Sequence, residues 1–200
     1  MRLRILERGH RLRARVALRI MRVVGGGEPD DVIKTSLYRP AFFGRPWIGL
    51  LREVMRGPSE WTAGERELFA AHTSRLNTCP YCVGIHTQTA TLGLRANITV
   101  QLLDRWRSSP FRPQIRAVLE LLEKITSASS VIAPGDIERV RAAGVSDAAI
   151  VDALHVCFVF NVVNRLANAF GHAAASEGDQ LAAARALHRF GYRLPGFLLQ

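Results

Sequence analysis

The spacing of apolar residues constrains the fold of this chain more than any other feature. Apolar residues recur with the 3.6-residue period of α-helices, whereas the alternation typical of β-strands is scarce. Glycine and proline interrupt this pattern where helices are expected to end, for example at Gly57-Pro58. The sequence therefore predicts an all-α protein with helices over residues 41–56, 62–76, 79–92, 97–107, 112–126, 134–143, 147–170 and 177–190.

The size and composition of the chain fit a globular protein with one sizeable core. The chain has 200 residues, of which 48% are hydrophobic and 22% charged, and we find neither an internal repeat nor a low-complexity tract. We expect residues 28–200 to form a single helical domain. Residues 1–27 precede it as a basic amphipathic N-terminal arm, which ends in a run of glycines.

The N-terminal arm holds eight arginines against the single acidic residue Glu7. Its apolar residues follow helical spacing, at Leu12, Val16, Ile20 and Val23. We favour an arm that packs on a neighbouring subunit or lies as a surface helix, with contact to an anionic membrane as the minority alternative. Nucleic-acid binding and an organelle presequence are weaker alternatives, because no groove-reading motif or interleaved aromatic residues accompany the arginines.

The residue types needed for redox chemistry come together in a CxxCxxxH array of Cys79, Cys82 and His86. Pro80 suits the first turn of a helix, where its missing N–H costs nothing, and Gly93 is expected to end this helix. The two cysteines and the histidine are then at positions i, i+3 and i+7, so their side chains share one helix face.

This placement favours a reactive dithiol. The thiolate is the nucleophilic form of cysteine, and a helix N-terminus stabilises negative charge by about 0.3–1 kcal/mol, which lowers a thiol pKa by roughly one unit at most. The helix dipole alone therefore leaves most of the thiol protonated at neutral pH. His86, four residues after Cys82, is the nearest base. The spacing of Cys79 and Cys82 also suits a disulfide with modest strain.

A carboxylate on the preceding helix supplies a fourth candidate residue, Glu67. Thr62 to Glu65 have the form of a capping box, and the residues that follow predict a helix ending near Leu76. An antiparallel hairpin of this helix with the next one would bring Glu67 beside His86. There a carboxylate would fix the imidazole tautomer and raise its basicity.

At these residues the chain resembles the AhpD-like superfamily, which contains the alkylhydroperoxidase D proteins and the carboxymuconolactone decarboxylases. The resemblance is carried by Arg66-Glu67-Leu68, by residues 74–86 and, for its peroxidase-related members, by Arg56-Gly57-Pro58-Ser59 and residues 161–168. It implies an AhpD-like helical bundle with a CxxC-bearing helical hairpin. It also implies that Cys82 attacks the peroxide and that Cys79 resolves the product by forming the disulfide. Glu67 and His86 would form a proton relay.

The resemblance implies a thiol-dependent alkyl hydroperoxide reductase. Cys82 would attack the hydroperoxide to give a sulfenic acid, and Cys79 would then form the disulfide. A dithiol, which in the family can be a lipoyl-bearing protein, would reduce that disulfide by exchange. No bound cofactor or metal is required, and the family implies a homo-oligomer, commonly a trimer or hexamer. Because the sequence shows no export signal, we expect a cytoplasmic location, where a CxxC stays reduced.

Other functions remain open for the same residues. In a lyase of the carboxymuconolactone decarboxylase type, acid–base residues act on a lactone and the cysteines are unnecessary. A redox sensor or a metal-binding protein would use the thiols without turnover, and Cys79, Cys82, His86 and Glu67 could supply four zinc ligands. Zinc is the weaker alternative, because no second CxxC or HxxxH pair occurs in the sequence.

Other polar residues and cysteines of the sequence lie outside this set of four. Some alkylhydroperoxidase D proteins carry a second histidine between the cysteines, where this chain has Tyr81, whose phenol is a poorer proton shuttle. His72 is close in sequence but has no assigned role. Cys157 lies in an apolar run and is expected to be a buried core thiol. A polar stripe that could line a cavity or an interface is formed by Asn161, Asn164 and Asn168.

Overall fold

The computed structural model describes residues 1–25 and 28–193, and these residues form helices and no strand. The prediction of an all-α protein is therefore confirmed. The α-helices are α1 (Ile5–Arg8), α2 (Leu12–Gly25), α3 (Asp31–Tyr38), α4 (Arg45–Arg56), α5 (Ala63–Leu76), α6 (Pro80–Leu94), α7 (Val100–Asp104), α8 (Pro113–Ala128), α9 (Pro134–Ala142), α10 (Asp147–Phe170) and α11 (Glu177–Phe190). A π-helical turn, Pro40–Gly44, leads into α4, and short 3₁₀ turns cover Trp106–Ser108 and Ser129–Val131.

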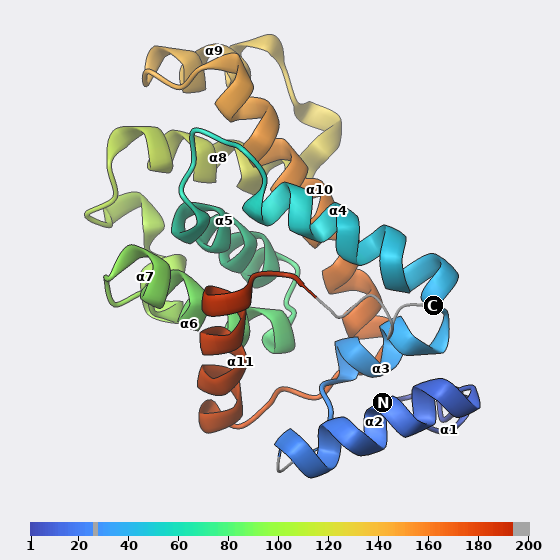
Figure 1. Ribbon diagram of the computed structural model, residues 1–200. Coiled ribbons are helices and arrows are strands. Elements are labelled where there is room, and N and C mark those ends of the chain that lie inside the picture. The colour runs from blue at the N-terminus through green and yellow to red at the C-terminus, as the bar shows by residue number, and fades with distance from the viewer. Residues whose placement is uncertain (26–27, 194–200) are drawn as a thin grey trace.

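The helical hairpin of α5 and α6 lies at the centre of the molecule (Figure 1). The capping box predicted at the start of α5 is confirmed, since Thr62 Oγ1 accepts from the Glu65 N–H and the Glu65 carboxylate accepts from the Thr62 N–H. The two helices run antiparallel, because Gly64 at the start of α5 lies against Gly93 at the end of α6.

The prediction that Gly93 ends α6 is wrong. The helix continues to Leu94, and Arg95 adopts the left-handed conformation that closes it. A Cβ added at Gly93 would lie 2.7 Å from the Cα of Gly64. Gly93 is therefore needed for close approach of two helix backbones and not for a helix stop.

The structure differs from the predicted helices in three further places. The α-helix expected over residues 41–56 begins at Arg45, after the π-helical turn Pro40–Gly44. The helix expected over residues 97–107 is split into α7 and the 3₁₀ turn Trp106–Ser108, because the backbone of Arg105 leaves the helical conformation at φ −113°. The short helix α3 was missed, although Asp30 caps it by accepting a hydrogen bond from the Val32 N–H at 3.0 Å. Eight residues are too few for periodicity to identify a helix clearly.

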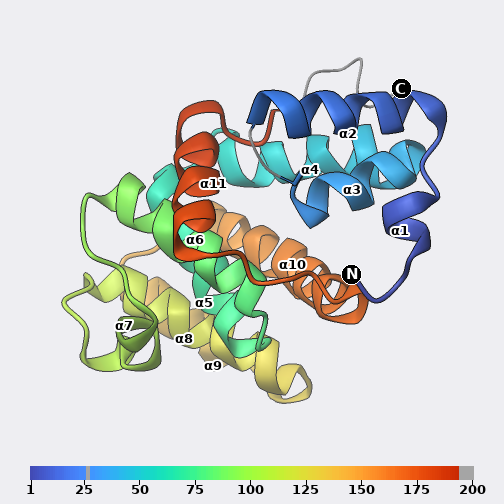
Figure 2. The ribbon, with the colours of Figure 1, turned by 90° about the horizontal axis from the view of Figure 1, so that it is seen from below.

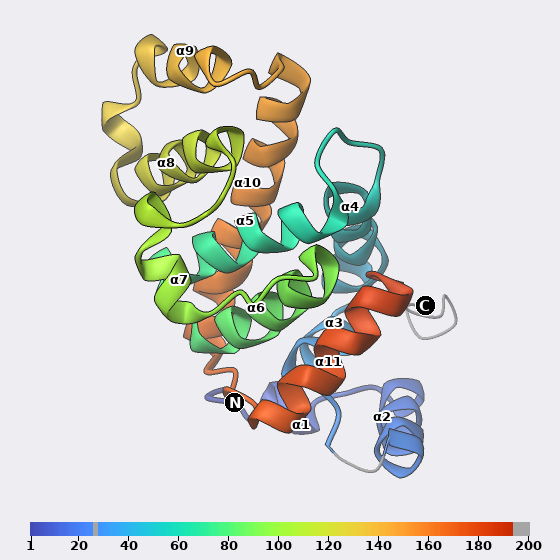
Figure 3. The same cartoon turned by 90° about the vertical axis from the view of Figure 1, so that its left-hand side faces the viewer.

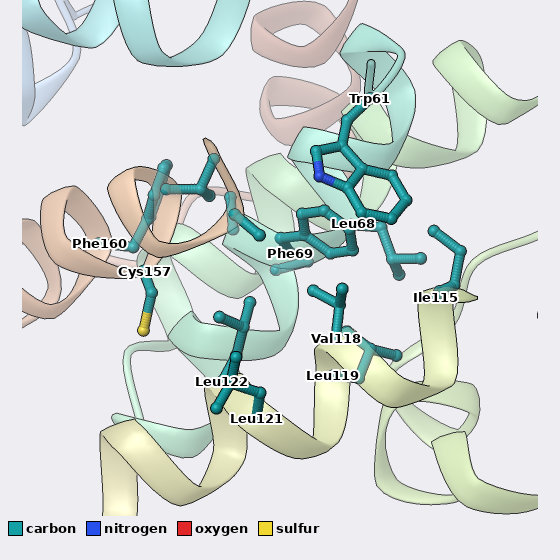
Figure 4. Close-up of a cluster of buried hydrophobic side chains, with 14 of the residues drawn as sticks. Trp61, Leu68, Phe69, Ile115, Val118, Leu119, Leu121, Leu122, Cys157 and Phe160 are labelled. Carbon is teal, nitrogen blue, oxygen red and sulfur yellow. The ribbon is translucent and has the colours of Figure 1, made fainter. Parts of the chain in front are cut away.

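The large apolar core lies between α5, α8 and α10 (Figure 4). Phe69 of α5, Leu119 of α8 and Phe160 of α10 are each at most 1% exposed. Trp61, just before α5, packs edge-on against Phe69 and donates its indole N–H to the Ala149 carbonyl at 2.7 Å. These contacts fix the face of α5 that is turned away from α6.

Helix α10 is long and apolar enough to cross a membrane, judged by length and composition alone. Its inner face packs against α4, α5 and α8, which is the placement of a core helix in a bundle. The remaining helices flank this bundle, with α11 lying along α6 (Figure 3). The N-terminal helices α1 to α3 lie at the end of the molecule opposite α7 to α9 (Figure 2).

Candidate active site

The two thiols of the CxxC motif lie at the N-terminus of α6. Cys79 is the residue that caps this helix, and Pro80 occupies its first position as predicted from the sequence. Thr78, just before the cap, has φ 51°, a left-handed conformation that is strained for a β-branched residue. Asn168 of α10 donates its side-chain amide to the carbonyls of Asn77 and Thr78. The strained turn that presents the dithiol is thus held by a neighbouring helix.

Cys79 and Cys82 are free thiols, both at most 1% exposed, and they lie in one small buried cluster. The hydrogen bond from Cys82 outweighs burial and, with backbone N–H groups of the first turn, lowers the pKa of Cys79 to about 7. The same contact and burial raise the pKa of Cys82 well above its ordinary value. The two pKa shifts thus favour ionisation of Cys79 before Cys82 in the resting pair, the reverse of the order expected from the sequence.

The hairpin brings Glu67 of α5 and His86 of α6 together. His86 Nδ1 lies 2.6 Å from Glu67 Oε2 in a buried contact. A carboxylate only accepts hydrogen bonds when ionised, so Nδ1 donates to Glu67 and Nε2 is the ring nitrogen left for other partners. Such an imidazole can take up a proton at Nε2, and the carboxylate stabilises the cation that results.

The second oxygen of Glu67 is held by two residues that the sequence did not indicate for this place. Arg56, at the end of α4, donates to Oε1 at 2.6 Å, and the Tyr192 hydroxyl donates to the same atom at 3.2 Å. Burial opposes the ionised form, but His86 and Arg56 outweigh it, so the pKa of Glu67 is lowered. Glu67 is thus a buried carboxylate with every oxygen partnered.

Arg56 also ties the C-terminal part of the chain to the site. Its guanidinium donates to the Leu187 carbonyl at 3.3 Å and lies 5.1 Å from the centroid of the Tyr192 ring. Tyr192 is 125 residues from Glu67 along the chain, so no sequence pattern could have linked them. Arg56 carried a signal, since it begins the Arg56-Gly57-Pro58-Ser59 segment that resembles the superfamily.

The asparagine stripe of α10 faces the dithiol loop. Asn164 is fully buried, and hydrogen bonds from it favour the ionised form of Cys79 and of Cys82. Its amide also donates to Ser74 Oγ at 3.0 Å, and its oxygen accepts from the Asn77 amide at 3.2 Å. The stripe, for which the sequence suggested the lining of a cavity or an interface, anchors the loop between α5 and α6, and Asn161 also lines a surface pocket.

Tyr81 and His72 both have hydrogen-bond partners outside the dithiol. The Tyr81 hydroxyl donates to Asp30 at the start of α3, and burial together with Asp30 raises the pKa of Tyr81 well above its ordinary value. His72 lies in the large core, where its Nε2–H donates to the Leu119 carbonyl at 3.2 Å. Burial lowers the pKa of His72 to about 4, so it is neutral near pH 7. Tyr81 packs in one small buried cluster with both thiols, whereas His72 belongs to the large core.

Cys157 is the buried core thiol that the sequence predicted. It is 1% exposed, and burial raises its pKa. Asn161 and Thr126 are its polar neighbours, at 3.2 and 3.6 Å from the sulfur. Cys157 belongs to the large core, whereas the CxxC thiols belong to a separate small cluster around Tyr81, Ile85 and Ala167.

The dithiol is covered by apolar side chains from three helices. Val32 of α3, Val163 of α10 and Leu187 of α11 pack on the cluster that contains both thiols. Gln180 of α11 sits directly over Gly84 of α6, where an added Cβ would lie 2.4 Å from the glutamine side chain. A hydroperoxide can therefore reach the sulfur atoms only when part of this cover moves.

The arrangement does not favour the four-ligand zinc site considered from the sequence. The Glu67 carboxylate is already bound to Arg56 and His86, and a neighbouring guanidinium disfavours a second cation. Across residues 1–25 and 28–193, no group of three or more His, Cys, Asp and Glu side chains is placed to hold a metal ion.

The structure is a helical bundle that buries two thiols at the start of one hairpin helix and a glutamate–histidine pair on the same hairpin. No protein-family model matches the sequence. It is 32% identical over 114 residues to the uncharacterized protein YdfG of Bacillus subtilis (strain 168), a match that covers 56% of this chain and 77% of that protein.

Two solved structures resemble this one. An uncharacterized peroxidase-related protein from Silicibacter sp. TM1040 shares 26% identity with a TM-score of 0.69, over 82% of this chain and 85% of its own. The alkylhydroperoxidase AhpD core of a peroxidase-related protein from Ralstonia eutropha JMP134 shares 24% identity with a TM-score of 0.72, over 88% and 92%. The structure therefore has an AhpD-like fold, and the chain is similar to peroxidase-related proteins with that fold.

Proposed function

We propose that this protein is a thiol-dependent alkyl hydroperoxide reductase. The observation that carries the proposal is the placement of two free, buried thiols, Cys79 and Cys82, and a buried Glu67–His86 pair on one hairpin. A dithiol supplies the two electrons that cleave a peroxide bond, and a histidine held by a carboxylate supplies acid–base chemistry.

The first step of the proposed cycle makes the sulfenic acid. His86, held by Glu67, takes the proton of Cys82 directly or through water. The Cys82 thiolate then attacks the distal oxygen of the hydroperoxide and breaks the O–O bond. The alkoxide that leaves takes the proton back from His86 and departs as an alcohol.

The second step forms the disulfide. Cys79 attacks the sulfur of the Cys82 sulfenic acid, and the hydroxide that leaves takes the Cys79 proton and departs as water. Two thiols and one hydroperoxide thus give a disulfide, an alcohol and water. The packing of Cys79 and Cys82 in one small buried cluster supports this role.

Return to the dithiol requires an external reductant. We propose a dithiol protein, of the lipoyl-bearing type that the superfamily resemblance suggests, which attacks the disulfide and is itself oxidised to a disulfide. The reductant meets the same apolar cover of α3, α10 and α11 side chains as the peroxide does. Movement of that cover is therefore part of both half-reactions.

The proposal is tested by the intact mass of the reduced protein before and after one equivalent of tert-butyl hydroperoxide, followed by peptide mapping. We expect rapid loss of two hydrogens, located at Cys79 and Cys82. Cys157→Ser is the matched control and should oxidise like the native chain, whereas Cys82→Ser should form no intramolecular disulfide. Unchanged thiols in the native chain would overturn the proposal.

The Cys82→Ser variant also separates the peroxidase from the lyase considered from the sequence. Lactone decarboxylation needs acid–base residues and no thiol, so a lyase would keep its activity in this variant. A redox sensor would oxidise with the peroxide but show no repeated turnover when a dithiol such as dihydrolipoamide is supplied. Continuous peroxide consumption with that reductant is the result we expect.

A further inference from the structure

Helix α2 carries a stripe of apolar side chains that nothing in the described chain covers. Its four members lie at spacings i, i+4, i+8 and i+11, which form one line along a helix. Their exposed fractions are 68, 51, 57 and 76% for Leu12, Val16, Ile20 and Val23. Scattered exposed apolar residues are ordinary on protein surfaces, but four on one line of a helix are typical of a binding surface.

The opposite side of α2 faces its own protein. Ala17 is 9% exposed, and Ala14, Leu18 and Met21 are half-buried. At 100° per residue these four side chains lie across the helix from the stripe. The helix is therefore attached to the domain through one face and presents the stripe outward.

Arginines border the exposed stripe. By helical position Arg11, Arg15, Arg19 and Arg22 line one edge, Arg13 lies at the other, and all five are exposed. In the described chain, Arg22 is the one arm arginine with a carboxylate partner, the exposed Glu28 at 2.6 Å. The outer face of α2 thus combines an apolar centre with a cationic edge.

The distribution of charge along the chain indicates what kind of partner binds this face of α2. The chain has 27 basic and 17 acidic side chains, and the arm takes eight of the basic and one of the acidic in its first 23 residues. The remainder holds 19 basic and 16 acidic side chains, so a second copy offers no acidic excess to the arginines. Nucleic acid offers negative charge but no apolar surface. An anionic lipid bilayer offers both, with phosphates at the level of the arginines and acyl chains beneath them.

We propose that α2 docks this protein on the surface of an anionic lipid bilayer. The helix lies in the plane of the membrane, with the stripe inserted among the acyl chains and the arginines at the headgroups. The position of α1 to α3 at the end of the molecule opposite α7 to α9 leaves this face unobstructed (Figures 1 and 2). The inference does not depend on the proposed peroxidase activity.

The test is flotation of the full-length protein with vesicles of phosphatidylcholine alone or mixed with phosphatidylglycerol. We expect binding to the mixed vesicles, little binding to the neutral ones, and weakening in high salt. Val16→Ser/Ile20→Ser should reduce binding about tenfold or more, because the inserted apolar area is lost. Arg15→Gln/Arg19→Gln should reduce it by a similar factor.

Matched variants replace the same residue types elsewhere on the surface. Val131→Ser/Val151→Ser and Arg105→Gln/Arg185→Gln change exposed side chains outside the arm and should bind like the native chain. Failure of the native protein to float with anionic vesicles would overturn the proposal. Full binding by Val16→Ser/Ile20→Ser would also overturn it, because charge alone would then explain the binding. If this variant instead dissociates an oligomer in sedimentation without vesicles, the stripe binds a second copy of the chain and the proposal is overturned.

Discussion

The two faces of α5 bury their side chains in different ways. Toward α8, Phe69 and His72 lie among aromatic and aliphatic residues, and the histidine has one carbonyl partner. Toward α6, Glu67 is equally buried but has three hydrogen-bond donors, Arg56, Tyr192 and His86. Burial alone neutralises a titratable group, whereas burial with oppositely charged partners keeps it ionised. One helix thus supports a structural core on one side and a candidate reactive site on the other.

The largest expected effect tests the structural side of this comparison. Phe69→Ala should lower the free energy of unfolding by about 4 kcal/mol, because a fully buried aromatic side chain is lost and a cavity remains. Denaturant unfolding measures this loss. Below its unfolding transition the variant should still oxidise its dithiol at the native rate. Phe158→Ala, at a 56% exposed side chain of α10, is the control and should change stability little; equal losses in both variants would remove the distinction between core and surface.

The second effect is the acid sensitivity that His72 gives the core. Its pKa is about 4 in the folded protein against an ordinary value near 6.5, so the unfolded chain takes up this proton first. Protonation of His72 therefore has no effect on stability above pH 6.5, and it lowers the free energy of unfolding by about 3 kcal/mol as the pH falls to 4. His72→Phe should flatten the dependence of unfolding free energy on pH in that window. The exposed His188→Phe should leave the dependence unchanged; if it flattens the curve equally, His72 is not the source.

The third effect tests the reactive side. Glu67→Gln keeps the shape of the side chain but removes the charge beside His86, and should slow oxidation of the dithiol by hydroperoxide on the order of a hundredfold. Stopped-flow loss of free thiols measures the rate. Glu65→Gln changes another buried glutamate of α5, which binds Arg112 on the far side of the helix, and should react at the native rate. A native rate for Glu67→Gln would remove Glu67 from the proposed proton relay.

The smallest effect concerns the turn between α5 and α6. Thr78→Gly should raise the unfolding free energy by about 1 kcal/mol, because glycine adopts a positive φ without steric cost. Arg95→Gly, at the other described non-glycine residue with positive φ, should show a similar but smaller gain, since arginine is not β-branched. Destabilisation by Thr78→Gly would mean that its side chain contributes more than its conformation costs.

Much of the fold could be predicted from the sequence because long amphipathic helices repeat their apolar residues many times. The limits of α5 and α10 followed from a capping residue at one end and a break at the other. The role of Gly93 could not be predicted, since its partner Gly64 is set by how two helices pack. The short α3 carries too few residues for periodicity to show.

Only part of the candidate site could be predicted from the sequence. Cys79, Cys82 and His86 share one helix, so local spacing placed them, and one hairpin brought Glu67 into reach. Tyr192 lies on the far C-terminal segment, which only the folded chain brings to Glu67. The distribution of charge between the thiols also depends on the helix cap and on Asn164, neither of which spacing specifies.

The asparagine stripe of α10 makes the length of this helix as important as its composition. Asn161, Asn164 and Asn168 reach the dithiol loop because they share one face of a helix that the core holds in register. Inserting one residue before Asn161 would turn all three by about 100° and release the loop, and seven added residues would restore the face but move it roughly 10 Å along the helix axis. The apolar residues of α10 can therefore be exchanged for others of similar volume, whereas the number of residues between its core contacts and the asparagines is fixed.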